Sequence, residues 1–319
     1  MRRTVKAYTG SNDARVTKVR AAALGTRGCS DKSATSGQHN ISSFRVASWN
    51  VDSMTGRAGE LVKAFGRRKL DIVCVQETRW KGAGTRIFGE QGGHYKFFWQ
   101  GGTDGTAGVG IFVAEKWIEC VVEVSRISER IMMIKFVLGN MVVNVLSLYS
   151  PQVGRSEEEK DVFWDKVFQL VNNIPQNDVV IVAGDLNGHV GKTSSGYEGV
   201  HGGFGYGDRN VEGVRILEFG DAMNLVICNT MFTKDDMKLV TYESGSVKSV
   251  VDYVLVRKKD RRLVRNAKII AGEECVYKHK LLVIDFSMQG GLRKNKRTYI
   301  PRLRTWKLAD GACKEEFAK

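Results

Sequence analysis

The chain has 319 residues, of which 42% are hydrophobic, so it can bury the core of one large domain or of two smaller ones. No apolar run approaches the length of a membrane span, and no apolar block near the start indicates a secretory signal. The six cysteines are scattered without a C-x-x-C pair, which argues against a cysteine zinc site and favours a reduced, intracellular compartment.

The net charge of +14 is concentrated at the two ends of the chain. Residues 1–43 hold eight basic and two acidic residues, and residues 286–319 hold nine basic and three acidic residues. The part between them is nearly neutral. Basic flanks attract polyanions, so nucleic acid is the first class of partner that they suggest, with acidic membrane surfaces second. Solvated tails without a partner are the alternative interpretation.

Residues 1–43 are rich in Ser, Thr, Gly and Arg and poor in aromatic residues, which predicts a disordered extension. From residue 44 onward, short apolar runs bounded by turn residues predict strands, and a helical spacing of apolar residues predicts a helix over 56–70. The strands predicted in this half are 44–51, 71–77, 108–114, 120–127, 130–138 and 141–150.

The second half begins with a predicted helix over 156–174, for which Ser156 and the acidic residues after it provide an N-terminal cap. A second helix is predicted over 211–224. The predicted strands of this half are 178–187, 225–230, 239–244, 249–257, 262–272 and 280–286. Strands with helices between them in both halves predict an α/β sandwich, followed by a basic linker over 287–319.

Polar side chains recur where the predicted strands end. The run "VVIVAGDLNG" has the composition of a buried strand, and it delivers Asp185 and Asn187 two positions apart. If the extended geometry continues, both side chains point to the same face, whereas an Asx turn that closes the strand is the alternative. Asn50, Glu77 and Tyr149 occupy similar strand ends, and each alone has an ordinary structural explanation. Their repetition in one chain favours an active site.

Asp252 lies within the apolar run "VVDYVLV", and a carboxylate in such a run is costly unless it is paired. His279 precedes the final predicted strand. If the strands of Asp252 and His279 neighbour each other, the carboxylate keeps the imidazole protonated and directs it at an anionic phosphate. The segment "GHVGKT" ends like a phosphate-binding loop, but Leu186 stands where that motif requires Gly, so we expect no nucleotide cofactor.

Taken in chain order, the strings "SWN", "QET", "LYSPQ", "GDLN" and "VDY" and the closing His resemble the endonuclease/exonuclease/phosphatase superfamily, which includes pancreatic deoxyribonuclease and the abasic-site endonucleases. The longer strings "VCVQETRWKG", "SLYSPQVG" and "RNVEGVRILEFGDAMNLVICNT" look more closely like the endonuclease domain of non-LTR (LINE-type) retrotransposons and the related craniofacial development protein 2-like proteins. The resemblance covers about residues 44–286. The string "PRLRTWKL" looks like the connector to a reverse transcriptase, which suggests a truncated element product or a domesticated relative.

The resemblance implies a DNase I-like fold over 44–286, a four-layer α/β sandwich of two packed mixed β-sheets flanked by helices. It also implies a metal-dependent DNA endonuclease that leaves 3′-hydroxyl and 5′-phosphate ends. Glu77, helped by Asn50, would hold Mg²⁺, with Mn²⁺ as the alternative ion. Asp185 would orient and deprotonate the attacking water, and Asn187 would stabilise the phosphorane oxygens.

By the same resemblance, His279, held by Asp252, would donate a proton to a non-bridging phosphate oxygen, and Tyr149 would contact the phosphate and help the 3′ oxygen to leave. Asn210 and Thr241 would lie near the substrate backbone. The chain departs from the family pattern beside the histidine. Many members have Ser-Asp-His where this chain has "YKH", so Lys278 replaces an acidic residue that often helps to bind metal.

Two other functions stay open at this point. One is a phosphatase or phosphodiesterase acting on a different phosphoester, and the other is a catalytically idle domain that serves as a DNA- or chromatin-binding module. The basic flanks favour DNA over the first, and Lys278 is the feature that favours the second. The basic segments "RKNKR" and "RKKDRR" suggest nuclear residence, as import signals or as contacts to a nucleic-acid backbone.

Overall fold

The computed structural model describes residues 15–18, 43–89, 93–271, 273 and 275–287. The chain divides into two units, Met1–Met288 and Gln289–Lys319, and all the described elements belong to the first. The predicted linker over 287–319 lies outside the described residues from 288 onward. No described helix is both long and apolar enough to cross a membrane.

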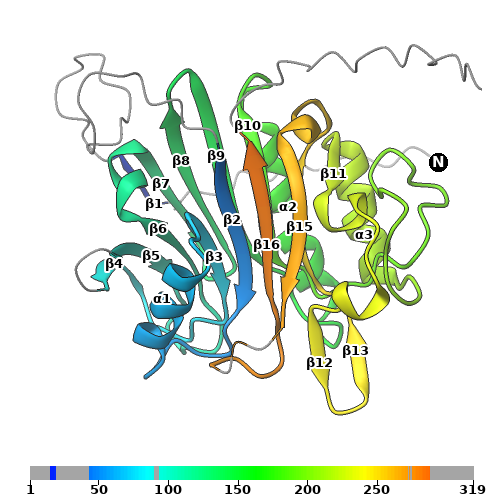
Figure 1. Cartoon of the computed structure of the whole chain (residues 1–319), viewed down its shortest axis with the longest axis horizontal. Coiled ribbons are helices and arrows are strands. Elements are labelled where there is room, and N and C mark those ends of the chain that lie inside the picture. The colour runs from blue at the N-terminus through cyan, green and yellow to red at the C-terminus, as the bar shows by residue number, and fades with distance from the viewer. Residues whose placement is uncertain (1–14, 19–42, 90–92, 272, 274, 288–319) are drawn as a thin grey trace, which may run out of the picture. The chain divides into compact units, whose positions relative to one another are not determined.

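Two seven-stranded mixed sheets form the body of the first unit (Figure 1). Sheet I contains, in spatial order, β1 (Arg15–Lys18), β7 (Val121–Ser128), β8 (Ile131–Leu138), β9 (Met141–Tyr149), β10 (Val179–Asp185), β14 (Asp252–Arg257) and β11 (Leu225–Ile227). Sheet II contains β15 (Val264–Ile270), β16 (Leu281–Ser287), β2 (Ser43–Asn50), β3 (Ile72–Gln76), β6 (Val109–Ala114), β5 (Tyr95–Gln100) and β4 (Ala83–Phe88). Strands β9 and β10 are parallel, as are β2 and β3, and the other pairs are antiparallel.

The inner faces of the two sheets bury one continuous apolar cluster. Val46, Cys74 and Ile111 of sheet II belong to the same cluster as Val145 and Ile181 of sheet I, and all five are fully buried. The central strands are covered on both faces, which explains why they appear in the sequence as unbroken apolar runs. The burial of these runs therefore brings the two sheets together.

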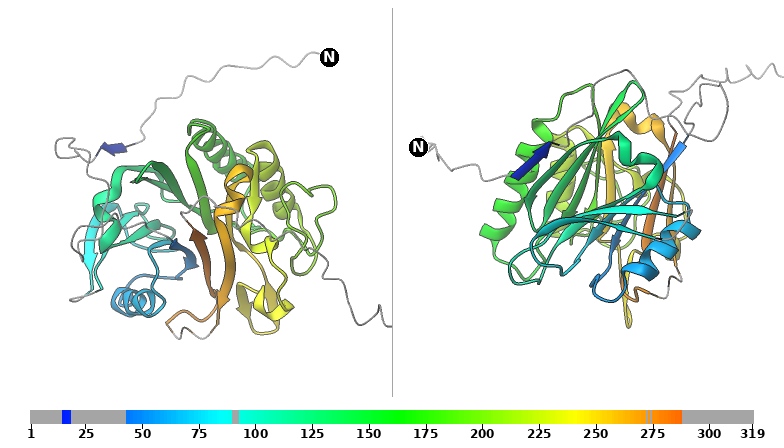
Figure 2. Two further views of the ribbon diagram at one scale, coloured as in Figure 1. Left: turned by 45° about the horizontal axis from the view of Figure 1, so that its top comes forward. Right: turned by 90° about the vertical axis from the view of Figure 1, so that its left-hand side faces the viewer.

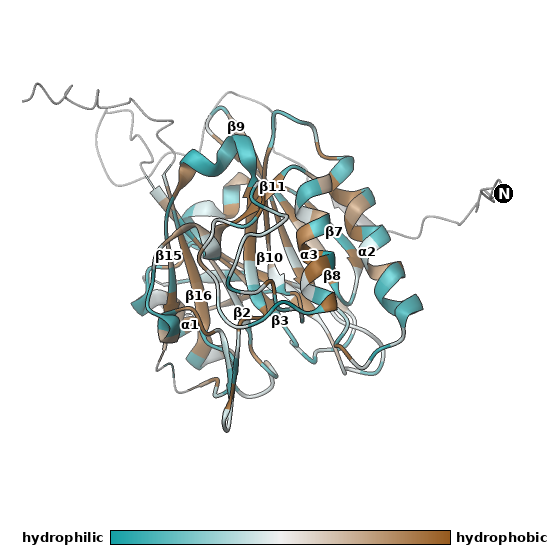
Figure 3. Ribbon diagram, turned by 90° about the vertical axis from the view of Figure 1, so that its right-hand side faces the viewer, coloured by the Kyte–Doolittle hydropathy of each residue, from teal (hydrophilic) through white to brown (hydrophobic). Residues whose placement is uncertain are grey.

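Helices cover the outer faces, so that the unit has four layers (Figure 2). Helix α1 (Ala58–Arg67) packs on sheet II through a cluster that includes Phe65, whereas α2 (Glu157–Asn172) and α3 (Val211–Ala222) pack on sheet I. Figure 3 shows hydrophobic faces of these two helices turned toward the strands and hydrophilic faces turned outward. The predicted four-layer α/β sandwich is therefore confirmed. The N-cap at Ser156 is also confirmed, because its side chain accepts a hydrogen bond from the Glu159 N–H.

The remaining elements are short connections. The hairpin β12 (Tyr242–Ser244) and β13 (Val247–Ser249) projects at the end of the sheets where β2 ends and β16 begins (Figure 1). The 3₁₀ turns are η1 (Glu115–Cys120), η2 (Cys228–Met231), η3 (Asp236–Lys238) and η4 (Lys258–Leu263).

The structure corrects several expectations about secondary structure. The predicted strand 225–230 ends at Ile227, because Cys228–Met231 forms η2, and the predicted strand 239–244 begins only at Tyr242. The extension 1–43 was predicted to be disordered throughout, but Arg15–Lys18 forms β1 against β7, because an extended segment needs only backbone hydrogen bonds to join a sheet edge. Residues 1–14 and 19–42 lie outside the described residues. Strands β4, β5 and β13 were not predicted. Strand β4 is an edge strand with mostly exposed side chains, so no apolar run marks it.

Candidate active site

The polar strand ends meet at one end of the two sheets. In sheet I, Asp185 is the partner of Tyr149 on one side and of Asp252 on the other, so three neighbouring strands present these side chains in a row. In sheet II, Asn50 ends β2 and Glu77 follows β3, its parallel neighbour. The packing of the two sheets places the polar side chains of sheet I opposite those of sheet II.

Asn50 joins the two groups. Its Nδ2 donates one hydrogen bond of 2.9 Å to Glu77 Oε1 and another of 2.9 Å to Asp185 Oδ2. Its Oδ1 accepts the Asp52 N–H at 3.0 Å, which fixes the orientation of the carboxamide. Asn50 is buried, so these charge-assisted bonds are made away from solvent. The amide therefore holds two carboxylates from different sheets at a set separation.

Glu77 is held in its ionised form by three donors. Besides Asn50, the Tyr149 hydroxyl donates to Oε1 at 2.9 Å and the Arg79 guanidinium donates to Oε2 at 3.0 Å. Burial raises the pKa of Glu77, but the hydrogen bonds from Asn50, Arg79 and Tyr149 outweigh it, and the net pKa lies below its ordinary value. Glu77 is thus a carboxylate at neutral pH.

Asp185 is 2% exposed and has a different protonation balance. Burial and the neighbouring Asp252 charge raise the pKa of Asp185 to about 7, although His279 and Asn50 oppose the rise. Its Oδ1 accepts the Asn187 N–H at 3.1 Å, so the predicted Asx turn exists, and Asn187 also lines the cavity described below. Asn187 has φ of +49°, so the extended geometry does not continue to this residue and the Asx-turn alternative is confirmed, whereas the functional role of this strand end stays a prediction. A carboxylate whose pKa lies near neutrality is suited to accept a proton.

His279 and Asp252 form a buried pair. His279 Nδ1 lies 3.0 Å from Asp252 Oδ2, and Nε2 lies 3.8 Å from Asp185 Oδ2. Burial lowers the pKa of His279, but the Asp252 charge and hydrogen bond outweigh it and raise the pKa to about 9. The imidazole is therefore protonated at neutral pH. Trp49 fixes the backbone by donating to the His279 carbonyl, and the Tyr242 ring contacts the imidazole edge to face.

The backbone at the site is unusual. Four site residues that are not glycine, Asp52, Glu77, Arg79 and Asn187, have φ between +49° and +58°. Left-handed backbone costs free energy for residues with a Cβ, and such residues persist only where the surrounding structure holds them. This strain agrees with a site in which the side-chain directions are fixed before a ligand binds.

A cavity of about 370 Å³ opens at these groups. Asn50, Glu77, Asp185 and His279 line it, together with exposed Lys278. A histidine, two carboxylates and a carboxamide therefore converge on one space, which is the arrangement expected of an enzyme that transfers protons at a charged group.

Comparison with known proteins shows the family to which the chain belongs. Residues 47–273 match the model of the Endonuclease/Exonuclease/phosphatase family. The chain belongs to this family. It is 28% identical over 249 residues to craniofacial development protein 2 from Bos taurus and 27% identical to that from Tragulus javanicus. The match covers 77% of this chain but 41% and 42% of those proteins, so the chain spans about two fifths of their length.

Solved structures share the fold. The endonuclease domain of TRAS1, a telomere-specific non-LTR retrotransposon, has a TM-score of 0.51 at 17% identity, covering 77% of this chain and 99% of that one. The AP endonuclease LMAP from Leishmania major has a TM-score of 0.56 at 12% identity, covering 77% of this chain and 88% of that one. The family resemblance read from the sequence motifs is thereby confirmed.

The family is one of hydrolases that generally depend on a divalent metal, and the donor set here fits such an ion. Glu77 offers a hard carboxylate oxygen at the wall of the cavity, which suits Mg²⁺. The Asn50 Oδ1 atom is not directed at the same space, because it accepts the Asp52 N–H. Asp185, Asp252 and His279 also have ligand atoms within 4.8 Å of one another, but the protonated imidazole disfavours a cation there.

Asn210 and Thr241 are not among the residues that line the 370 Å³ cavity. Asn210 caps α3, and its Oδ1 accepts the N–H groups of Gly213 and His189 at 2.8 Å each. Thr241 is fully buried, and its hydroxyl accepts the Asp252 N–H at 3.2 Å. Both residues position neighbouring segments of the site, and their contact with a substrate stays a prediction.

The sequence interpretation missed several residues of the site, among them Asp52, whose N–H holds Asn50, and Tyr242, whose ring contacts His279. Arg79 bonds to Glu77, and Gln152 donates to the Tyr149 hydroxyl at 3.3 Å. The Arg130 guanidinium lies over the Tyr149 ring, 4.9 Å from its centroid. Arginines and glutamines are common on surfaces, so only the strand-end position of Arg79, two residues after Glu77, offered a signal.

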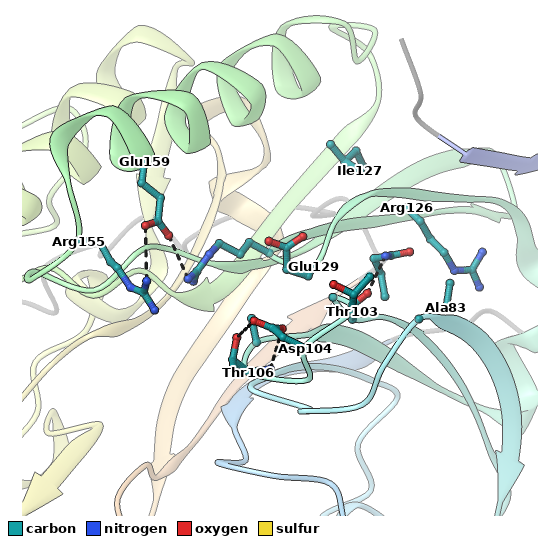
Figure 4. Close-up of a pocket in the computed structure, with 15 residues that line it drawn as sticks. Ala83, Thr103, Asp104, Thr106, Arg126, Ile127, Glu129, Arg155 and Glu159 are labelled. Carbon is teal, nitrogen blue, oxygen red and sulfur yellow. Dashed lines mark hydrogen bonds and ion pairs between the residues drawn. The ribbon is translucent and has the colours of Figure 1, made fainter. Parts of the chain in front are cut away.

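A larger cavity of about 720 Å³ lies beside α2 and the β7–β8 turn (Figure 4). Three arginines and three acidic residues line it, and the ion pairs of Arg130 and Arg155 with Glu159 neutralise part of its charge. No histidine lines it, and its acidic side chains are not gathered around a shared donor. Despite its larger size, it is therefore the weaker candidate for an active site.

Proposed function

We propose that the chain is a metal-dependent DNA endonuclease that hydrolyses phosphodiester bonds and leaves 3′-hydroxyl and 5′-phosphate ends. The observation that carries the proposal is the bridge from Asn50 to both Glu77 and Asp185, with the Asp252–His279 pair beside it. The bridge sets one ionised carboxylate and one carboxylate of raised pKa side by side. Two carboxylates whose pKa values are separated by their environments can divide metal binding and proton acceptance between them.

The side chains divide the chemistry among them. Asp185 orients the attacking water and takes its proton, for which its raised pKa suits it. Protonated His279 points Nε2 toward the cavity and donates to a non-bridging phosphate oxygen, because Nδ1 is held by Asp252. Asn187 stabilises the phosphorane oxygens, and the Tyr149 hydroxyl assists the departing 3′ oxygen.

Glu77 holds the metal ion in this proposal, and Mg²⁺ is the expected ion, with Mn²⁺ as an alternative. When bound, the ion supplies positive charge that stabilises the developing charge on the phosphate oxygens. Asn50 keeps the Glu77 carboxylate oriented through its Nδ2, and the Tyr149 hydroxyl does the same from sheet I. Both act as positioning residues toward the ion.

DNA is the proposed substrate for two reasons. The excess positive charge lies on the two ends of the chain, which suits a polyanion. The named structural neighbours are endonucleases, one of them from a retrotransposon. The basic segments also support a proposal of nuclear residence. Arg257 of "RKKDRR" does not present its charge to a partner, because it is buried and donates to the carbonyls of Ile174, Pro175 and Asp178.

The test is relaxation of supercoiled plasmid by the intact chain, with Mg²⁺ or with a chelator, beside Glu77→Ala and His279→Ala. We expect Mg²⁺-dependent nicking that both substitutions abolish, and ligation of the nicks by DNA ligase, which requires 3′-hydroxyl and 5′-phosphate ends. If the chain binds DNA but does not nick it over a wide range of Mg²⁺ concentrations, the proposed endonuclease activity is refuted.

A binding module without catalysis is the second candidate. The observation that favours it is Lys278, an exposed cation that lines the catalytic cavity beside His279. A positive charge there opposes the binding of a metal ion. Lys278→Asp distinguishes the two functions, because it restores the acidic residue of the family pattern. Nicking that appears only in Lys278→Asp would show that the native site is silent.

A further inference from the structure

A second hollow adjoins the catalytic cavity. Arg79, Trp80, Lys81, Arg86 and Trp99 line it, and its volume is about 420 Å³. We call it the tryptophan groove. Arg79 lines both the groove and the catalytic cavity, where its guanidinium bonds to Glu77. One side chain therefore separates the groove from a proposed catalytic carboxylate.

The edge of sheet II builds the floor of the groove. Gly84 of β4 is the cross-strand partner of Trp99 of β5, and a Cβ at Gly84 would collide with the Trp99 indole. The glycine leaves room for this ring to lie across the edge strand. Trp80 packs against Trp99 edge to face, with ring centroids 5.1 Å apart. Trp99 is part of β5, whereas Trp80 lies in the connection between β3 and β4 and is held by ring contacts with Trp99 and Phe97 of the sheet.

The rim of the groove is cationic. Arg79, Lys81 and Arg86 are exposed, and no carboxylate lines the groove. In the part of the chain that the structure describes, neither Lys81 nor Arg86 has an ion pair with a carboxylate within 4.0 Å. Arg79 is paired with Asp52 and Glu77, so the groove combines its aromatic rings with the charges of Lys81 and Arg86.

A ligand that matches this combination has flat aromatic groups and regularly spaced negative charge. Proteins that bind single-stranded nucleic acid use this pairing of basic side chains with aromatic platforms. An acidic peptide would satisfy the cations but would leave the indoles without a flat partner. The groove also adjoins the catalytic cavity through Arg79, so one nucleic-acid strand can extend from the phosphate that is cut in the cavity into the groove.

We propose that the tryptophan groove binds the nucleic-acid strand next to the scissile phosphate, with an unstacked base against Trp80 and Trp99 and its phosphates at Lys81 and Arg86. The proposal rests on the proposed function, since it names a further subsite for the same substrate. It predicts that binding at the groove needs neither the metal nor the catalytic carboxylates.

Two comparisons by fluorescence anisotropy, made on the full chain with a chelator present, test the groove. The first measures the affinity for a short single-stranded DNA over a series of NaCl concentrations. The double variant Lys81→Gln/Arg86→Gln should reduce the slope of log affinity against log salt by about 0.7 for each phosphate that the protein no longer neutralises. The matched variant Lys63→Gln/Lys166→Gln, which removes the same charge from exposed positions on α1 and α2, should keep the native slope.

The second comparison uses an abasic oligonucleotide of equal length. The intact chain should bind the base-containing strand at least about 5-fold more tightly, since stacking of one base contributes about 1–3 kcal/mol. Trp80→Leu, checked for folding by circular dichroism, should reduce that preference. An unchanged slope in the groove variant, or equal affinity for the two strands, would overturn the proposal. If plasmid is still nicked in that case, the proposed endonuclease stands without the groove.

Discussion

The imidazole Nδ1 of His279 lies 3.0 Å from Oδ2 of Asp252, although the two residues come from different sheets. Asp252 begins β14 of sheet I, and His279 precedes β16 of sheet II. The pair therefore forms only when the two sheets pack. This contact also determines which ring nitrogen is available in the proposed active site, because Nδ1 is occupied and Nε2 is turned toward Asp185.

The first prediction concerns pH. The pKa of His279 is raised from 6.5 to about 9, so the imidazolium persists through neutrality and is lost as the pH rises through about 9. Nicking should fall on that alkaline limb. The raised pKa also means that the pair stabilises the fold fully below pH 6.5, and that this contribution is lost as the pH rises through about 9. NMR titration of the imidazole gives the midpoint directly.

Asp252→Asn is the control for this prediction. It removes the charge that raises the pKa of His279, so the NMR midpoint and the alkaline limb should both move to lower pH. A rate loss of about 10²–10⁴-fold is expected if the imidazolium acts as a proton donor. An alkaline limb that stays in place in Asp252→Asn would assign it to a different group.

The second prediction concerns the bridge. Asn50→Ala removes the donor shared by Glu77 and Asp185, so the two carboxylates lose their common orientation. The rate of nicking should fall by about 10²–10³-fold, as for loss of one preorganised donor. Asn144→Ala is the matched control. This buried asparagine lies near the start of β9, away from the site, and donates a hydrogen bond to Asp178. It should lose stability but keep activity.

The third prediction concerns the tyrosine. Tyr149→Phe keeps the ring beneath Arg130 but removes the hydroxyl that donates to Glu77. A hydrogen bond to a charged group contributes about 1.5–3 kcal/mol, so we expect nicking to need a higher Mg²⁺ concentration. Tyr95→Phe, which removes a hydroxyl that donates to the Leu70 carbonyl, should leave the Mg²⁺ dependence unchanged. Equal Mg²⁺ requirements in the two variants would contradict the assigned role.

The fourth prediction concerns a glycine before Asp185. A Cβ at Gly184 would collide with the carbonyl oxygen of Leu148 on the neighbouring strand. Gly184→Ala should therefore reduce the free energy of unfolding by about 1–3 kcal/mol and displace Asp185. Gly66→Ala, within α1 and with no atom near the added Cβ, should instead stabilise the chain by about 0.5–1 kcal/mol. Urea unfolding of both variants checks the difference.

Much of this protein can be predicted from its sequence because local patterns carry the information. The buried strands appear as apolar runs, Ser156 signals the start of α2, and the polar residues at strand ends mark the end of the sandwich where the candidate site lies. Strand β4 escapes prediction, because an exposed edge strand has no buried face to impose a pattern.

The main polar groups of the site can be predicted from the sequence, since the motifs around Asn50, Glu77, Asp185 and His279 are local. Their pairing depends on the three-dimensional packing. The contact of Asn50 with Asp185, 135 positions away, and the raised pKa of Asp185 both depend on the packing of one sheet against the other. Burial and through-space charge act between residues distant in the chain, so no local pattern encodes them.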